Sequence, residues 1–334
     1  MRQVMRHARV FMNGIAALAF CAAWVVFAAD AVDAQVYPTR PIHIVVAEPG
    51  TQSDAMGRAI APSLMRILGQ PVVIENQGGA GGTIAAQRVA QARGDRYTLL
   101  IGGVNNVVLA TLVRAKLAYA PATDLLPLGG IARVPYGIAI TRTIPAENLT
   151  EFFAYGRAHP GELSFGSSGT GSSSQLAIEL LKARLGLDML HVPYRGTTSA
   201  LPDLIGGRIQ VMASDLSLLL PQAKAGRIRL VAVTGAHRTE ASPDTPTVAE
   251  QGVPGYAIEP WYGLFAPAGI PRDVEYALSR ALAEALHSDE VRQQLLAQGY
   301  EPLQLSGEAL RGFAVEETAK YSDLIDVAGL RNSQ

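Results

Sequence analysis

The sequence of 334 residues contains a single cysteine, Cys21, and that cysteine lies in an apolar stretch near the amino terminus, residues 15–29. Three arginines precede this stretch, and small residues follow it at positions 32–34. A basic segment, an apolar core and a small-residue end are typical of a secretory signal, so we predict that residues 1–34 are cleaved on export. The alternative is a membrane anchor, because the apolar run is almost long enough to span a bilayer.

Loss of this segment would leave the exported chain without cysteine, which excludes a disulfide, a thiolate nucleophile and a cysteine-based metal site. Histidine is also scarce, since the chain has only six, and none shows the spacing of a zinc motif. The glycine-rich segments do not match a dinucleotide fingerprint either. We therefore expect neither a metal nor a cofactor.

Charged residues make up only 17% of the chain and balance to a formal net charge of −1. Without a basic stripe or tail, a nucleic acid is not an expected partner. Hydrophobic residues amount to 49%, which suits a globular protein with a sizeable core. Beyond the amino-terminal stretch no apolar run is long enough to span a bilayer. We expect an exported protein that is monomeric.

Short apolar runs that predict strands alternate with amphipathic segments that predict helices. Their order in residues 42–102 favours a parallel sheet with right-handed crossovers, and a second series begins at Tyr136. The predicted fold class is therefore α/β, in two successive halves. The predicted strands are residues 42–47, 72–75, 97–102, 136–141, 163–166, 189–193, 208–212, 228–234 and 262–269. The predicted helices include one that ends at Gly69 and three near the carboxyl terminus, within residues 274–286, 291–298 and 307–327.

Four loops rich in glycine, serine and threonine follow predicted strands and precede predicted helices: residues 49–53, 78–83, 166–174 and 196–199. In open α/β sheets such loops meet at the carboxyl ends of the strands, where ligands bind. Free backbone N–H groups and the helix dipole favour an anion there. Together they predict a cleft made of neutral hydrogen-bond donors, although any one loop could simply begin a helix.

The loop GSSGTGSSS, residues 166–174, resembles two catalytic motifs without completing either. It has the glycine spacing of a phosphate loop, but Ser172 stands where the lysine should be. It also nearly matches the hydrolase elbow G-x-S-x-G, but Thr170 replaces the last glycine. A secreted hydrolase with a serine of this loop as nucleophile and His191 as base is an alternative. Ser172 and Gln175 match a capping box, which would direct the helix amides toward a bound carboxylate.

Ordered sequence blocks across residues 37–330 resemble the Bug-type (TctC-like) tripartite tricarboxylate receptor family of periplasmic solute-binding proteins. The blocks include YPTRPIHIVV, LGQPVVIENQGGAGGTIAAQRVA, HVPYRGTTSALPDLIGGRIQVM and WYGLFAPAGIP, in the family's order. The resemblance implies an α/β, two-lobed periplasmic-binding-protein fold (Venus flytrap, type II-like) with parallel-rich sheets flanked by helices. We assign residues 35–134 and 256–334 to lobe 1 and residues 135–255 to lobe 2.

The resemblance also implies a function that is not enzymatic. A member of this family captures a small carboxylate or related solute between its lobes for uptake by a membrane transporter. The membrane subunits of a tripartite tricarboxylate transporter are then the expected partners. Delivery of the ligand to a signalling receptor is an alternative.

The predicted ligand-binding residues combine positions matched to the family with two positions at strand ends where this chain departs from it. The matched positions are in the loop after the first strand, in the long serine-rich loop and at the start of a later helix, with a looser match at Asp215. The predicted residues are Glu48, Gly50, Thr51, Gln52, Ser53, Asp54, Asn105, Ser167, Ser168, Gly171, Ser172, Ser173, Tyr194, Gly196, Thr197 and Asp215.

Glu48 stands near a position where the family usually has an aromatic residue. A carboxylate facing the cleft would repel a second carboxylate of the ligand. We therefore predict a small organic acid with one carboxylate, an amino acid or a neutral amide as the ligand. The alternative is that Glu48 turns away and pairs with a surface arginine such as Arg58.

Overall fold

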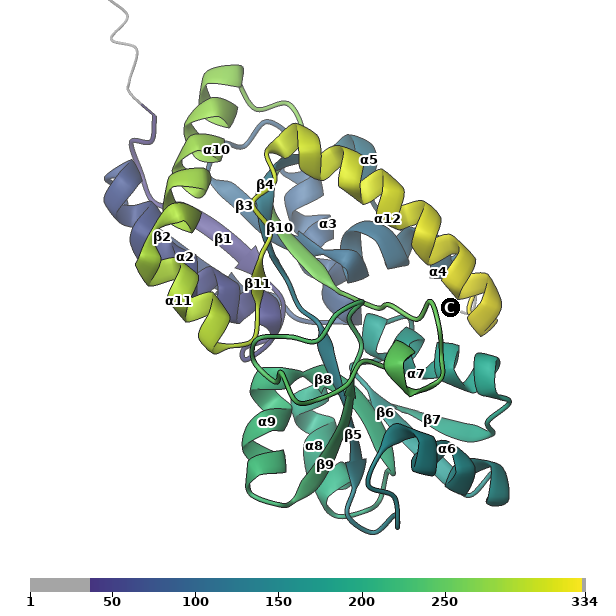
Figure 1. Cartoon of the computed structure of the whole chain (residues 1–334). Helices are drawn as coiled ribbons and strands as arrows, with labels where there is room; N and C mark the ends of the chain where they lie inside the picture. Colours follow the sequence, from purple (N-terminus) through teal and green to yellow (C-terminus); the bar gives the residue numbers. More distant parts are fainter. Residues whose placement is uncertain (1–36, 332–334) are drawn as a thin grey trace, which may run out of the picture. The chain divides into compact units, whose positions relative to one another are not determined.

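The computed structural model describes residues 37–331 (Figure 1). The predicted signal peptide, residues 1–34, therefore lies outside the described residues. All helices and strands described below belong to one compact unit that begins at Arg40. No helix within residues 37–331 is long and apolar enough to cross a membrane.

The first sheet has six strands in the order β11-β4-β10-β3-β1-β2. Its strands are β1 (Ile42–Val46), β2 (Val72–Asn76), β3 (Thr98–Gly103), β4 (Leu125–Arg133), β10 (Trp261–Pro267) and β11 (Glu301–Pro302). Strand β1 pairs in parallel with β2 and β3, which confirms the predicted parallel order at the start of the chain. Strand β10 runs antiparallel between β3 and β4, and β11 runs antiparallel to β4.

Helices cover both faces of this sheet, with α2, α10 and α11 on one side and α3 and α12 on the other (Figure 1). Their bounds are α2 (Gln52–Leu68), α3 (Thr83–Gln91), α10 (Arg272–His287), α11 (Asp289–Ala297) and α12 (Gly307–Ala328). Short elements fill the connections: η1 (Ala80–Gly82), η2 (Val104–Leu109), α4 (Ala110–Val113) and α5 (Pro121–Asp124).

Helix α2 follows directly from its sequence pattern. Met56, Ile60 and Leu64 recur at helical spacing and are buried against the sheet. Gly69 ends the helix in the left-handed region, at φ +68°, and its N–H donates to the carbonyl of Met65 at 3.0 Å. The predicted glycine stop is thereby confirmed.

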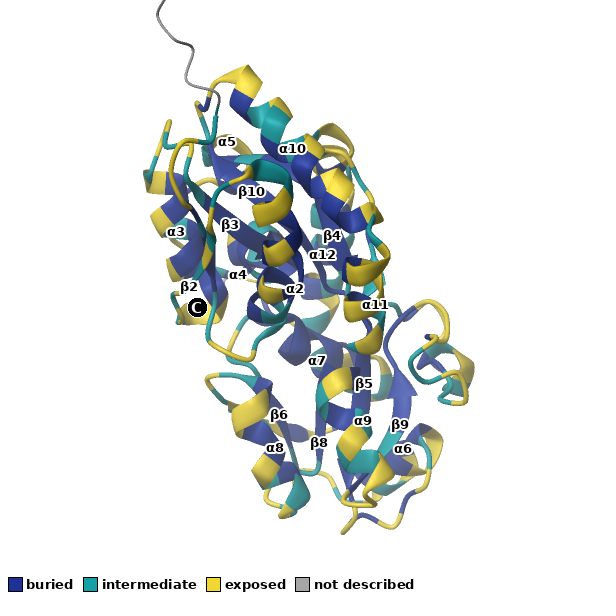
Figure 2. Ribbon diagram, turned by 90° about the vertical axis from the view of Figure 1, so that its left-hand side faces the viewer, coloured by how far each residue is buried: buried dark blue, intermediate teal, exposed yellow. Residues whose placement is uncertain are grey.

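The second sheet has five strands in the order β7-β6-β8-β5-β9. They are β5 (Tyr136–Thr141), β6 (Leu163–Ser167), β7 (Met189–Pro193), β8 (Val211–Asp215) and β9 (Ile228–Val233). Strand β6 is parallel to β7 and β8, while β5 is antiparallel to β8 and β9. The helices of this part are α6 (Leu149–Ala158), α7 (Ser173–Leu185), α8 (Thr197–Ile205), α9 (Leu216–Lys224) and the short η3 (Ala249–Gln251). Figure 2 shows the inner strands of both sheets largely buried, whereas the edge strands β2 and β7 also carry intermediate and exposed residues.

Two strands of the first sheet were not predicted, and β4 is the more instructive of them. Its sequence, LLPLGGIAR, contains a proline and a Gly-Gly pair, which are signals of a loop. The structure gives the reason for one of these glycines. A Cβ on Gly130 would lie 2.6 Å from the carbonyl oxygen of Leu303, so a side chain there would block the segment that carries β11. The predicted strand at residues 208–212 also begins later, at Val211.

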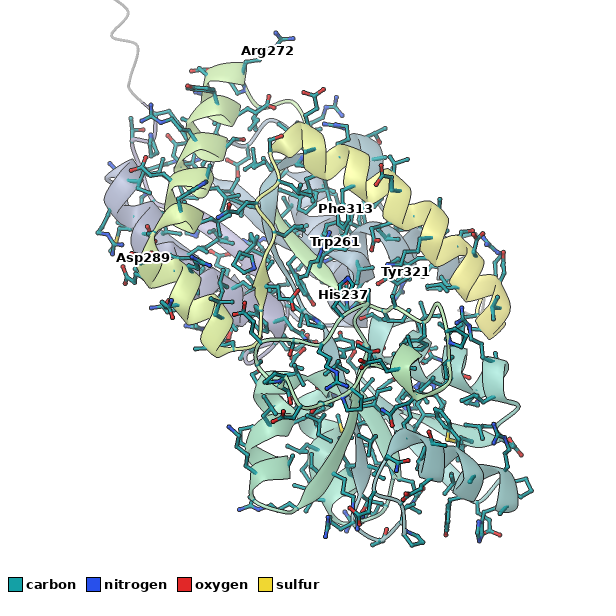
Figure 3. All side chains as sticks on the ribbon, in the orientation of Figure 1. His237, Trp261, Arg272, Asp289, Phe313 and Tyr321 are labelled. Atoms are coloured by element: carbon teal, nitrogen blue, oxygen red, sulfur yellow. The ribbon has the colours of Figure 1, made fainter. Side chains whose placement is uncertain are left out.

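The chain passes from the first sheet to the second between Arg133 and Tyr136 and returns before Trp261. The two passages are hydrogen-bonded to each other, because the N–H of Val134 donates to the carbonyl of Pro260 at 2.6 Å. Helix α12 contacts β4 of the first sheet and α7 of the second. Phe313 of this helix packs edge-on against Trp261, with ring centroids 5.4 Å apart (Figure 3).

Candidate functional site

A cavity lies at the carboxyl ends of parallel strands from both sheets. The loops that follow β1, β3, β6 and β7 and the last residue of β8 all contribute to its wall. This position is the one that the strand order predicts for a ligand site in an open α/β sheet. The lining residues are Ala47, Glu48, Gly50, Thr51, Gln52, Ser53, Gly81, Gly82, Ile101, Gly103, Asn105, Asn106, Ser168, Arg195, Gly196, Thr197, Thr198, Asp215 and Tyr262.

The loop between β1 and α2 is fixed by its own hydroxyl groups. Ser53 Oγ accepts a hydrogen bond from the N–H of Ala47 at 3.1 Å, and Thr51 Oγ1 donates to the carbonyl of Glu48 at 2.7 Å. Thr51 is the N-cap of α2 but makes no side-chain capping hydrogen bond. The first amides of α2 are therefore left without a side-chain cap, beside the cavity, where the helix dipole favours an anion.

Asp54 does not line the cavity; it organises this loop from behind. Its carboxylate accepts hydrogen bonds from the N–H of Gly50 at 3.0 Å, from Arg58 at 3.1 Å and from Asn76 at 2.9 Å. Burial alone would raise the pKa of Asp54, but these three donors together hold it below its ordinary value. Asp54 is thus a positioning residue, and a ligand would have to displace three partners to reach its carboxylate.

Glu48 lines the cavity and does not pair with Arg58, whose guanidinium bonds Asp54 instead. Its Oε1 accepts a hydrogen bond of 2.6 Å from the N–H of Gly79, in the loop between β2 and η1. A Cβ on Gly78 would lie 2.5 Å from the Glu48 side chain, so this loop approaches Glu48 closely because of its glycines. The alternative of a Glu48–Arg58 pair is therefore wrong.

The serine-rich loop before α7 is largely occupied with capping its own helix. Ser172 is the N-cap, and its hydroxyl accepts from the N–H of Gln175 and donates to the carbonyl of Gly169. The side chain of Gln175 in turn accepts from the N–H of Gly171 at 2.7 Å, one residue before the N-cap. The capping residue at Ser172 is as predicted, but these bonds leave only Ser168 of the loop in the cavity wall.

Ser167 and His191 form a close pair outside the cavity. Ser167 Oγ lies 2.6 Å from His191 Nε2, Ser167 is fully buried, and the imidazole stacks on Phe165. Burial lowers the pKa of His191, so the ring is neutral at pH 7. The hydroxyl of Ser168, which does face the cavity, instead lies 2.9 Å from Ser174 Oγ. In the hydrolase alternative, the predicted base His191 therefore contacts Ser167, which a substrate cannot reach.

The second sheet contributes the start of α8 to the cavity. Gly196 is the N-cap of this helix and offers no side chain, so the first helical amides at Thr197 and Thr198 face the site without a side-chain cap. The exposed side chain of Arg195 lines the same region. Tyr194 is directed elsewhere, because its hydroxyl donates to Asp203 at 2.7 Å.

Two hydrogen-bonded contacts cross the cavity from one sheet to the other. Gln52 Nε2 donates to both carboxylate oxygens of Asp215, at 2.6 and 2.7 Å. Asn105 Oδ1 accepts from the N–H of Ser173 at 3.0 Å. Tyr262 of β10 supports the first contact by donating to Gln52 Oε1 at 3.3 Å. Burial raises the pKa of Asp215 to about 6, and the bond from Gln52 lowers it only in part.

The structure thus brings together ten of the sixteen predicted residues in the cavity wall, which are Glu48, Gly50, Thr51, Gln52, Ser53, Asn105, Ser168, Gly196, Thr197 and Asp215. The other six, Asp54, Ser167, Gly171, Ser172, Ser173 and Tyr194, hold the loops in place from outside it. The predicted residue list did not name Arg195 or Thr198, although Thr198 lies within the predicted cleft loop of residues 196–199 and Arg195 directly precedes it. It also missed Tyr262, which reaches the site from a distant strand and gave no local signal.

No group of three or more histidine, cysteine, aspartate or glutamate side chains in the described part of the chain is arranged to hold a metal ion. The arrangement supplies uncapped helix amides, hydroxyls, one arginine and two carboxylates around a single cavity. Such a set binds and orients a small polar solute.

Comparison with known proteins agrees with this arrangement. The chain is 32% identical to Protein BugT of Bordetella pertussis over 302 residues, which cover 90% of this chain and 93% of BugT. A solved structure of an R. palustris protein with adipate is 36% identical, has a TM-score of 0.84 and matches 88% of this chain and 98% of its own. The periplasmic binding protein BugD is 31% identical with a TM-score of 0.83, over 88% of this chain and 99% of its own.

These likenesses confirm the predicted α/β fold of the periplasmic-binding-protein type. The model of the tripartite tricarboxylate transporter family receptor, TctC, matches residues 56–330. The chain therefore belongs to the tripartite tricarboxylate transporter receptor family.

Proposed function

We propose that this protein is a periplasmic receptor that binds a small carboxylate-bearing solute in the cavity between its two sheets. The observation that carries the proposal is the convergence of the α2 and α8 amino termini, both without side-chain caps, on one cavity at the strand ends. A carboxylate is stabilised by such amides and by the dipoles of both helices. The similar R. palustris protein was solved with adipate, which supports a carboxylate as the recognised group.

Capture and release would use the two passages between the sheets as a hinge. We assign residues 35–134 and 256–334 to one lobe and residues 135–255 to the other, because the two sheets divide the strands in this way. A ligand that contacts α2 and α8 together stabilises the closed arrangement by binding it more tightly than the open one. The bound solute would then be delivered to membrane subunits of a tripartite tricarboxylate transporter.

The proposal excludes catalysis as the role of the cavity and includes export through cleavage of residues 1–34. Ser168 is the serine of its loop that faces the cavity, and its hydroxyl contacts Ser174, not a histidine. Fractionation of cells that express the full chain tests export, with the processed form expected in the periplasmic fraction. Full-length protein retained in the membrane would instead support the anchor.

The binding function is tested by mass spectrometry of solute released from protein purified without refolding, and by thermal unfolding with a panel of small acids. A ligand that binds only the folded state stabilises it by RT ln(1 + [L]/Kd), so the unfolding temperature rises with the logarithm of the ligand concentration once that exceeds Kd. We expect a released solute with at least one carboxylate, and stabilisation by members of the panel. If no acid of up to six carbons raises the unfolding temperature, the proposed function is wrong.

A further inference from the structure

Asp215 is the most enclosed charged side chain in the cavity wall. It is the last residue of β8 and is only 7% exposed. Both of its oxygens face Gln52 of α2, whose single amide nitrogen donates to each of them. The carboxylate is therefore aimed across the cavity, with both oxygens presented to a nitrogen donor.

The groups around this carboxylate are neutral. Tyr136 lies opposite it on β5, and Tyr262 and Tyr300 are close enough for Asp215 to raise their pKa values further, beyond what burial does. No lysine, arginine or histidine among residues 37–331 forms an ion pair with Asp215. A buried carboxylate without a cationic partner is costly to keep ionised, and such groups occur where a ligand supplies the missing partner.

Gln52 satisfies the carboxylate only in part. An ionised carboxylate has about four lone-pair directions, and the two hydrogen bonds from Gln52 occupy two of them. An ammonium group offers three donors and an amide offers two. Either could fill the remaining directions or take over those that Gln52 uses, whereas a second carboxylate would offer none.

The cavity wall carries both negatively charged groups and groups that are positive or donate hydrogen bonds. Asp215 and Glu48 supply its negative charge, while Arg195 and the amino terminus of α8 supply positive charge and N–H donors. A ligand with one negative and one donating end can satisfy both kinds of group at once. A dicarboxylate of the same length would place one of its ends against a buried carboxylate.

We propose that Asp215 makes this receptor selective for solutes that carry an ammonium or amide N–H group in addition to a carboxylate, with the nitrogen at Asp215. The inference rests on the proposed binding function and names its ligand class. Amino acids and acid amides of two to six carbons belong to this class. Gln52 is the positioning residue that keeps the carboxylate turned toward the cavity.

The test is a matched ligand panel measured by isothermal titration calorimetry at pH 7.5. Each set has one carbon skeleton with a carboxylate, an amide or an ammonium at its variable position, for example glutarate, glutaramate and 5-aminopentanoate. In the wild type we expect the best nitrogen-bearing member to bind at least about tenfold more tightly than its matched dicarboxylate. In Asp215→Asn this preference should fall to less than about twofold or reverse, because the amide side chain brings no charge.

Two controls separate a specific effect from damage to the fold. Asp244→Asn removes an exposed carboxylate outside the cavity and should leave the preference unchanged. The wild-type panel needs no variant, so the inference stays testable even if Asp215→Asn does not fold. Tight wild-type binding of dicarboxylates over their nitrogen-bearing partners overturns the inference but leaves the receptor function standing. If no acid of either kind binds, the proposed function itself has failed.

Discussion

The side-chain oxygen of Asn105 accepts a hydrogen bond of 3.0 Å from the backbone N–H of Ser173, so a residue after β3 of the first sheet caps the first turn of α7 beside the second sheet. Asn105 lines the cavity, whereas Ser173 lies just outside it. The bond therefore links the two halves of the molecule at the edge of the site.

Asn105→Ala should weaken ligand binding, because it removes one contact that holds the halves together around the solute. We expect Kd to rise about fivefold, the equivalent of one hydrogen bond of about 1 kcal/mol. Asn148→Ala is the matched control: Asn148 caps α6 by accepting from Glu151, away from the cavity, and its loss also costs about 1 kcal/mol of stability. Equal affinities for the two variants would show that the Asn105 contact plays no part in binding.

Ser172→Ala should destabilise the protein without affecting the ligand. The hydroxyl of Ser172 caps α7, and loss of an N-cap lowers the free energy of unfolding by about 1 kcal/mol. Because Ser172 does not line the cavity, Kd should change by less than about twofold, as judged by calorimetry beside denaturant unfolding. A large loss of affinity in a folded Ser172→Ala protein would show that Ser172 takes part in ligand binding.

Asp215→Asn should raise the free energy of unfolding at neutral pH. Burial raises the pKa of Asp215 from its ordinary 3.8 to about 6, so the folded protein holds this proton more tightly than the unfolded chain does. The corresponding stability is complete below about pH 4 and is lost as the pH rises to about 6, by up to about 3 kcal/mol. The variant has no carboxylate at position 215, so it does not lose this stability. Its free energy of unfolding should therefore exceed that of the wild type at pH 7.5, by a difference that shrinks toward pH 4.

Urea unfolding at several pH values between 4 and 7.5 measures this effect. The advantage is reduced if asparagine bonds Gln52 less well than the carboxylate does, since one of its two polar atoms is a donor. If the variant is less stable than the wild type by the same amount at every pH, then burial does not raise the pKa of Asp215.

Local sequence patterns predicted most of the fold and the parts of the site that depend on a single loop. The apolar run of β1, the helical stripe of α2 and the stop at Gly69 each follow from neighbouring residues. The Gly50–Ser53 part of the cavity wall could be predicted from neighbouring residues in the same way. Strand β4 was not, because its proline and Gly-Gly pair are local signals of a loop, and Gly130 is explained only by the close approach of Leu303 from far along the chain.

The remaining part of the site depends on contacts between distant residues. Gln52 and Asp215 are 163 positions apart, and Tyr262 is 210 positions from Gln52, so no local pattern could indicate that they meet. The serine-rich loop shows the opposite difficulty. Its hydroxyls predicted ligand donors, but most of them serve the amino terminus of α7, and which partner a hydroxyl takes is decided by the packed structure.

Ser167→Ala should lower stability and leave no catalytic activity to lose. The hydroxyl contacts His191 Nε2 at 2.6 Å, so its removal leaves the ring nitrogen of the half-buried His191 without this partner, at a cost of about 1 kcal/mol. A nucleophile must also be reached by its substrate, and Ser167 is fully buried. We therefore expect the wild type, Ser167→Ala and Ser168→Ala to hydrolyse p-nitrophenyl acetate at the same background rate.

The pH dependence of this pair provides a second measurement. Since burial lowers the pKa of His191, the unfolded chain takes up the proton first as the pH falls below about 6.5, and the folded state loses stability in that range. His191→Gln keeps a side-chain group that can bond Ser167 but does not titrate, so its stability should fall less between pH 7 and pH 5. An esterase rate that follows the ionisation of His191 and disappears in Ser167→Ala would establish the pair as catalytic and contradict a purely structural role.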